Sequence, residues 1–254
     1  MTEASNQSAS HLAEMHTHEA IAARIASTTN HSYLGDFVLG AVDGVVTTFA
    51  IVAGVAGAGL GAGVAMVLGV ANMLADGLSM GAGNFLKARA DARVLDRYRR
   101  MEEMHIDQAP EGEREEIRQI FAAKGFEGDL LERAVDVITQ DRRRWVDTML
   151  TDEWGLTLNQ PNPIGAGAIT FVAFVLAGSL PLIPLMFVGW LTPNQTFVIS
   201  AGLAGLAFLI VGAVQGFITD LSPTLNSLYM LLVGGSAAAV AYFVGAALHG
   251  LTGI

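Results

Sequence analysis

The chain has 254 residues, of which 52% are hydrophobic and 15% charged, whereas a soluble domain usually has about 25% charged residues. Thirteen of the fourteen Lys and Arg residues lie between Lys87 and Arg144, and from Trp154 to Ile254 the one charged residue is Asp220. This distribution of charge excludes a soluble protein. The absence of Cys excludes disulfides and thiolate metal sites. The net charge of −10 argues against a nucleic-acid partner and for cations as partners.

Residues 1–32 form a polar N-terminal segment with mild helical character. It lacks the basic start and the short apolar core of a cleaved signal peptide. Three histidines, His11, His16 and His18, give it a weak capacity for metal, but we interpret it as a polar tail.

Five apolar runs follow, and each is close to the length of about 20 residues that a helix needs to cross a bilayer. They cover roughly residues 36–59, 62–87, 164–190, 196–219 and 227–249. The sequence therefore predicts an all-α polytopic membrane protein. Its expected parts are the N-terminal segment 1–32, the first two spans in 33–87, a polar insert in 88–160 and three more spans in 161–254. An odd number of spans places the termini on opposite sides.

The insert reads as a small domain of three helices. The first continues the second span through "ARADARVLDRYRRMEEMHID". The second, "PEGEREEIRQIFAAKG", begins with Pro and acidic residues and ends at Gly125, which are the usual start and stop signals. The third, "DLLERAVDVITQDRRRWVDTMLTDEWG", opens with Asp129 and Glu132 in capping-box spacing. Because nearly all Lys and Arg lie in the insert, we expect it in the cytosol, together with the N-terminus.

Three aspartates, Asp36, Asp43 and Asp76, fall in or near the first two spans. A charge at the bilayer centre costs about 2.5–3.5 kcal/mol, so such residues usually face an interior path or a partner. No Lys or Arg lies in any span except Lys87 at the end of the second. These carboxylates should therefore either bind a proton or hold a cation. The alternative for Asp43 is a structural role as a neutral acid that hydrogen-bonds to a neighbouring helix.

The second span adds thioethers to this picture. Met73, Asp76 and Met80 are spaced three and four residues apart and share one helix face. Sulfur beside a carboxylate favours a borderline transition metal over Ca²⁺ or Mg²⁺. Core packing is the alternative role for these methionines.

The insert carries a second group of candidate ligands, in pairs that each project from one helix face. The pairs are Glu102 and His105, Glu113 and Glu116, and Met149 and Glu153. Side chains three or four residues apart suit a shared metal site. The alternative is a solvated charged surface, which is common on cytosolic helices.

The motifs "GDFVLGAVDGVVTTFAIVAGVAGA" and "LADGLSMGAGNFL", followed by the charged insert and three spans, resemble the vacuolar iron transporter family over about residues 31 to 251. The resemblance implies a homodimer of five-span subunits that exports Fe²⁺, and often Mn²⁺, from the cytosol in exchange for protons. It places Asp43 and Met80 on the path between the subunits. It also implies a cytosolic set of metal ligands: Glu102, His105, Glu113, Glu116, Met149 and Glu153.

Three positions depart from the family pattern. His105 stands where the family usually has Glu, which keeps a ligand but makes the site richer in nitrogen. Asn84 replaces a common glutamate, and Asn72 is neutral where some relatives have an acid. Both asparagines reduce the negative charge expected near the cytosolic entrance.

The sequence thus predicts a proton-coupled exporter of divalent metal in the cell inner membrane, with Fe²⁺ as substrate rather than prosthetic group. We expect a carrier and not an enzyme, and Asp36 and Asp76 are assigned to the path with Asp43 and Met80. Two alternatives are a membrane-anchored metal sensor and a di-iron protein of ferritin type, suggested by Glu102-x-x-His105. The second requires another Glu-x-x-His helix, which the sequence lacks, and the first leaves three intramembrane aspartates unexplained.

Overall fold

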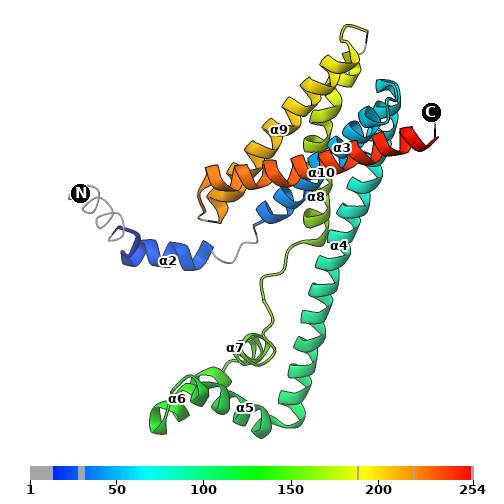
Figure 1. The fold of residues 1–254 in the computed structure, drawn as a ribbon. Coiled ribbons are helices and arrows are strands. Elements are labelled where there is room, and N and C mark those ends of the chain that lie inside the picture. Colours follow the sequence, from blue (N-terminus) through cyan, green and yellow to red (C-terminus); the bar gives the residue numbers. More distant parts are fainter. Residues whose placement is uncertain (1–13, 28–31, 188, 220, 253–254) are drawn as a thin grey trace. The chain divides into compact units, whose positions relative to one another are not determined.

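The computed structural model describes residues 14–27, 32–187, 189–219 and 221–252, and these contain helices and no strand. The all-α prediction is confirmed. The chain divides into two compact units, one with the N-terminal residues to Ser32 and residues 90–161, the other with residues 33–89 and 162–254. Helix α4 (Ala62–Gln108) is continuous and contributes to both units (Figure 1). In the N-terminal segment α2 covers His18–Ser27, and His11 lies outside the described residues.

The second unit contains the apolar helices. They are α3 (Leu34–Gly57), the first part of α4, α8 (Pro163–Ser179) with its 3-10 continuation η2 (Leu180–Phe187), α9 (Pro193–Ile218) and α10 (Pro223–Thr252). Pro occupies the first turn of α8 and α9, where its missing N–H costs no helical bond. All five helices, with α8 and η2 counted as one, are long and apolar enough to cross a membrane. This confirms the five predicted spans, and we call this part the membrane unit.

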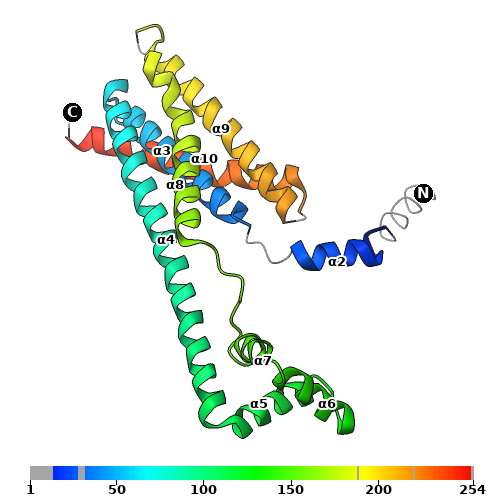
Figure 2. The ribbon, with the colours of Figure 1, turned by 180° about the vertical axis from the view of Figure 1, so that it is seen from behind.

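Helix α3 lies in the middle of the membrane unit, against α8, α9 and α10 (Figures 1 and 2). Glycines allow α3 to approach α8 closely. A Cβ on Gly40 would lie 2.3 Å from the carbonyl oxygen of Thr170, and a Cβ on Gly44 would lie 2.3 Å from that of Phe174. Small residues at such crossings are the usual means by which helices associate in lipid.

The outer faces of the membrane unit are apolar. Large hydrophobic side chains on each of its five membrane helices are more than half exposed, for example Leu39, Val67, Leu176, Phe217, Phe243 and Leu251. So many exposed large hydrophobic side chains are unusual on a soluble monomer. It fits the hydrocarbon interior of a bilayer.

The predicted insert of 88–160 corresponds to residues 90–161 of the structure, which keep this name and contain the end of α4 and three further helices. These are α5 (Pro110–Ala123), α6 (Gly128–Thr139) and α7 (Arg142–Thr148), which a π-helical turn, η1 (Met149–Glu153), extends. Their apolar faces form a core of their own. It includes Ile117, Val135, Val146, Met149 and Leu150, each at most 1% exposed.

The third helix predicted for the insert differs from the structure in two details. It breaks between α6 and α7, because the Asp141 side chain accepts a hydrogen bond from the Arg144 amide (2.8 Å) and starts a new helix there. The predicted capping box at Asp129 and Glu132 is wrong. The residue that precedes α6 is Glu127, which makes no capping bond with its side chain, and Asp129 lies inside the first turn.

The contact between α4 and α8 leads to a stability prediction. A Cβ on Gly81 would lie 2.8 Å from the carbonyl oxygen of Gly167, whereas a Cβ on Gly83 would meet nothing within 4 Å. Gly81→Ala should therefore destabilise the purified chain by about 1–3 kcal/mol, as overpacking does. Gly83→Ala, two residues along the same helix, should be neutral or stabilising. Thermal unfolding in detergent measures both, and equal melting temperatures for the two variants would contradict the close α4–α8 contact.

Candidate metal sites

The insert brings together three predicted ligands from two helices. Glu102 and His105 lie on α4 and Glu113 on α5, and one ligand atom of each lies within 4.8 Å of the other two. The His105 Nδ1 is 3.3 Å from Glu113 Oε1. One imidazole and two carboxylates at this spacing can coordinate a single divalent transition metal.

A sharp corner between α4 and α5 creates this arrangement. Helix α4 ends at Gln108, Ala109 adopts a non-helical backbone, and Pro110 begins α5. Glu102 and His105 share one face of α4 because they are three residues apart. The corner turns the first turn of α5, which carries Glu113, toward that face. The N-terminus of α5 also favours a carboxylate there through the helix dipole.

Two of the three ligands are buried carboxylates. Glu102 is 1% exposed and Glu113 is 5% exposed. In each, the Oε2 atom is buried and has no hydrogen-bond donor among the described residues. An unsatisfied buried acceptor costs about 1–3 kcal/mol, and more if it is charged. A proton on one carboxyl group, or a metal ion between the two, would remove this cost.

Two further predicted ligands, Glu116 and Glu153, are exposed acids that lie close enough to Glu113 for their charges to act on it. Burial, followed by the negative charges of Glu116 and Glu102, raises the pKa of Glu113 to about 8. Partial desolvation, followed by the charges of Glu116 and Glu102, raises the pKa of Glu153 to about 7. Four carboxylates thus repel one another at one place, which we call the acidic cluster: Glu102, Glu113, Glu116 and Glu153. His105 lies at its side.

Met149, the sixth predicted ligand, is fully buried in the core of the insert. It begins the π-helical turn that ends at Glu153. π-Helical turns occur often at functional sites, where they redirect side chains. The structure shows Met149 as a core residue, and its role as a ligand stays a prediction.

Six basic residues of the insert form ion pairs with acids outside the acidic cluster. The ion pairs are Arg99–Asp147, Arg143–Asp147, Arg114–Asp136, Arg118–Glu115, Arg118–Glu132, Lys124–Asp152 and Arg142–Asp107. Among the described residues, the one ion pair that reaches the cluster is His105–Glu113. The cluster therefore needs a proton or a mobile cation to balance its charge.

Trp154 is a site residue that the sequence analysis missed. Its indole Nε1 donates a hydrogen bond to Glu102 Oε1 (2.8 Å), and its ring packs on Tyr98 with the centroids 4.4 Å apart. The bond holds Oε1 of Glu102, while Oε2 has no hydrogen-bond partner among the described residues. A tryptophan directly after the acidic "TDE" is the one signal that the sequence offered.

The membrane unit has a second candidate site. Asp43 on α3 and Met80 on α4 line one open cavity of about 520 Å³. The two residues predicted to share the path therefore do share a cavity within one subunit. A carboxylate and a thioether therefore line the same cavity.

Asp36 and Asp76 are not among the residues that line this cavity. Each accepts a hydrogen bond from an asparagine instead, Asp36 Oδ1 from Asn84 (2.8 Å) and Asp76 Oδ2 from Asn72 (2.7 Å). The two asparagines that depart from the family pattern thus also serve as donors to intramembrane acids. Asn84 further donates to Thr170 Oγ1 on α8 (2.8 Å).

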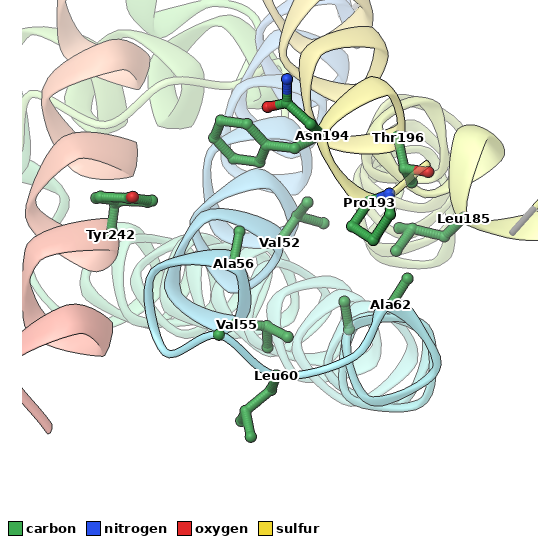
Figure 3. Close-up of a pocket in the computed structure, with 13 residues that line it drawn as sticks. Val52, Val55, Ala56, Leu60, Ala62, Leu185, Pro193, Asn194, Thr196 and Tyr242 are labelled. Atoms are coloured by element: carbon green, nitrogen blue, oxygen red, sulfur yellow. The ribbon is translucent and has the colours of Figure 1, made fainter. Parts of the chain in front are cut away.

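Another cavity, of about 420 Å³, lies where α3 ends and α9 begins (Figure 3). Side chains of α3, α4, α9, α10 and η2 surround it, and its polar members are Asn194, Thr196 and Tyr242. Among the described residues no carboxylate lines it. We therefore assign no metal site to this cavity.

The five apolar helices define an integral membrane protein, and its acidic cluster and its carboxylate–thioether cavity offer ligands that suit cations. The VIT family model matches residues 34–246. The chain is 32% identical over 237 residues to the vacuolar iron transporter of Toxoplasma gondii, which covers 89% of this chain and 78% of that protein. It is also 32% identical over 208 residues to vacuolar iron transporter 1 of Eucalyptus grandis, with 82% and 83% covered.

The chain therefore belongs to the VIT family, a family of transporters. This confirms the resemblance drawn from the two span motifs. It also identifies the chain as a multi-pass membrane protein of a metal-transporting family.

The raised pKa of Glu113 leads to a prediction about pH. Its pKa of about 8 in the folded chain exceeds the ordinary value of 4.5, so the folded state holds a proton that the unfolded state releases. The stability of the metal-free protein should therefore fall as the pH rises from about 5 to 8. Glu113→Gln should reduce this slope and stabilise the protein at pH 8 by about 1–3 kcal/mol.

Thermal unfolding of the purified chain in detergent with a chelator measures the effect. The control is Glu115→Gln, on the same helix, because Glu115 pairs with Arg118 outside the cluster. It should leave the slope between pH 5 and pH 8 unchanged. A Glu113→Gln variant with the wild-type pH slope would contradict the assignment of the buried proton.

Proposed function

We propose that this chain exports Fe²⁺ from the cytosol in exchange for protons, with Mn²⁺ as a second substrate. The observation that carries the proposal is the set of carboxylates without a fixed cation, in the insert and again in the membrane unit. Such groups bind either protons or metal, and a carrier that couples the two requires groups of this kind. Iron as substrate is supported by the names of the relatives.

In this proposal the acidic cluster collects metal in the cytosol. The cytosolic location is supported by the Lys and Arg residues, thirteen of which lie in or directly beside the insert. Glu102, His105 and Glu113 form the inner ligands, and Glu116, Met149 and Glu153 are assigned to the same site. Mutual repulsion in the metal-free cluster favours cation binding, and metal entry displaces the proton on Glu113.

In this proposal the metal ion then crosses the membrane through the Asp43–Met80 cavity. No basic residue lies in the spans before Lys87, so the charge of Asp43 is balanced by a proton or by the passing ion. We assign Asp36 and Asp76 to the same path. Each is hydrogen-bonded to an asparagine and does not line the cavity.

The working form in this proposal is a homodimer in the cell inner membrane, with the N-terminus and the insert in the cytosol. Its partners are the lipid bilayer, divalent metal ions and protons. The proposal includes no prosthetic group and no nucleic-acid partner. Two observations oppose the alternatives. A sensor needs no carboxylate–thioether cavity between its spans, and a ferritin-type enzyme needs a second Glu-x-x-His helix.

Transport in sealed proteoliposomes tests the proposal directly. The purified chain should move Fe²⁺ and Mn²⁺ across the bilayer and move protons in the opposite direction. A chain that binds metal but carries none would be a sensor, and metal-dependent oxidation of Fe²⁺ without flux would indicate an enzyme.

Asp43→Asn is the sharpest variant for coupling, because it keeps the shape of the side chain but removes the charge. We expect the variant to insert and fold, and its Fe²⁺-driven proton movement to fall to the level of empty liposomes. The control is Asp96→Asn, which removes an exposed carboxylate of the insert outside the acidic cluster. Wild-type exchange by Asp43→Asn would leave Asp43 as a structural acid.

A further inference from the structure

One side of α4 carries four arginines just beyond the end of the apolar part of this helix. They follow one another at intervals of three or four residues, so they share one helix face: Arg89, Arg93, Arg97 and Arg100. All four are exposed. We propose that this surface, which we call the arginine face, binds the anionic headgroups of phospholipids in the bilayer around α4. The inference goes beyond the proposed function and does not depend on it.

The arginine face continues the side of α4 that exposes apolar side chains. Val67, Leu74, Leu78, Phe85 and Arg89 are seven, four, seven and four residues apart, which keeps them on one side of a continuous helix. Val67 is 68% exposed and Leu78 is 65% exposed. Acyl chains of lipid therefore cover this side of the span, and the headgroup of the same lipid lies next to the first arginines.

The first two arginines lie at the depth of the headgroups. The apolar run ends at Leu86, and at about 1.5 Å per residue the Cα atoms of Arg89 and Arg93 lie about 4.5 Å and 10.5 Å further along the helix. Side chains lean toward the N-terminus of a helix, which in α4 is the membrane end, so the guanidinium groups lie nearer the hydrocarbon than these values. A headgroup layer is about 5–8 Å thick. Both groups therefore reach lipid phosphates.

The protein orients these arginines but supplies no anion to them. The Cζ atom of Arg89 lies 5.9 Å from the centroid of the Phe85 ring, a cation–π contact that adds no negative charge. Between Arg89 and Arg100, the one acid on this side of the helix is Asp96, so the face keeps a net positive charge. A guanidinium can bind a phosphate through two parallel N–H bonds. Anionic lipid supplies the missing partner.

A merely solvated charged surface is the competing role. Acidic residues outnumber basic ones in this chain, 24 to 14, and six basic residues of the insert do form ion pairs with acids. Among the described residues, no ion pair involves the four arginines of the arginine face. Their position directly after a lipid-covered side favours lipid over water as the partner, since basic residues beside a span are attracted to anionic lipid.

Competition between two lipids tests the proposal. Purified full-length protein in detergent would be mixed with equal amounts of phosphatidylglycerol and phosphatidylcholine with the same acyl chains, which differ in headgroup charge. Native mass spectrometry then counts each lipid retained. The wild-type protein should prefer phosphatidylglycerol about tenfold or more, since each basic residue near the headgroups contributes about fivefold. High salt should reduce this preference. Soluble glycerol phosphate should not displace the lipid, because it cannot use the apolar side of α4.

A double variant tests the residues. Arg89→Gln with Arg93→Gln removes two charges, and the ratio of the two retained lipids should fall to near one. Arg89→Lys with Arg93→Lys keeps the charges and should keep most of the preference. The control is Arg133→Gln with Arg143→Gln, which changes the net charge equally at exposed positions on α6 and α7. It should retain the wild-type ratio. Circular dichroism checks that each variant is folded.

Three results would overturn the inference, and none of them involves metal flux. The first is equal retention of the two lipids by the wild-type protein. The second is a preference for phosphatidylglycerol that the folded Gln variant leaves unchanged or, if that variant does not fold, one that high salt leaves unchanged. The third is displacement of the lipid by glycerol phosphate, which would identify a site for soluble anions. Loss of proteoliposome transport with an intact lipid preference would contradict the proposed function alone.

Discussion

The feature on which the rest of this structure depends is uncompensated negative charge. In the insert, Glu102 and Glu113 are buried, and each has an oxygen that no donor in the described part of the chain reaches. Basic side chains of the insert such as Arg99, Lys124 and Arg142 are bound to other acids. In the membrane unit, the spans carry aspartates and, before Lys87, no basic residue. A charge that the protein does not balance must be balanced by something that can leave. Protons and divalent metal ions are the two candidates, and a carrier needs both.

The fold keeps these charges in place without neutralising them. In the insert, ion pairs such as Arg142–Asp107 and Arg99–Asp147 connect α7 to α4, so the scaffold stabilises itself around the cluster. Trp154 holds one oxygen of Glu102 through a neutral donor rather than a cation. In the membrane unit, asparagine amides do the same for Asp36 and Asp76. Neutral donors orient a carboxylate and leave its charge available for metal.

Local pattern predicted much of the fold and part of the site. Span length and charge distribution were enough for five membrane helices, and helical spacing placed Glu102 and His105 on one face. That Glu113 meets them depends on the corner at Ala109, for which Pro110 was a visible signal. The bond between Trp154 and Glu102 was not predicted, because spacing within one helix says nothing about which helices meet. The sequence analysis missed the break at Asp141 because the helical pattern continues through this position. The break depends on the Asp141 side chain, which accepts a hydrogen bond from the Arg144 amide.

Proton release on metal binding tests the central claim most directly. Purified full-length protein in weakly buffered detergent would be titrated with Mn²⁺ while a pH indicator records protons released per ion bound. With the pKa of Glu113 near 8 and that of Glu153 near 7, binding at pH 7 should release about one proton or more per ion. Binding at pH 9, where both groups are already ionised, should release almost none. Metal binding with no proton release at pH 7 would contradict the exchange of proton for metal at the acidic cluster.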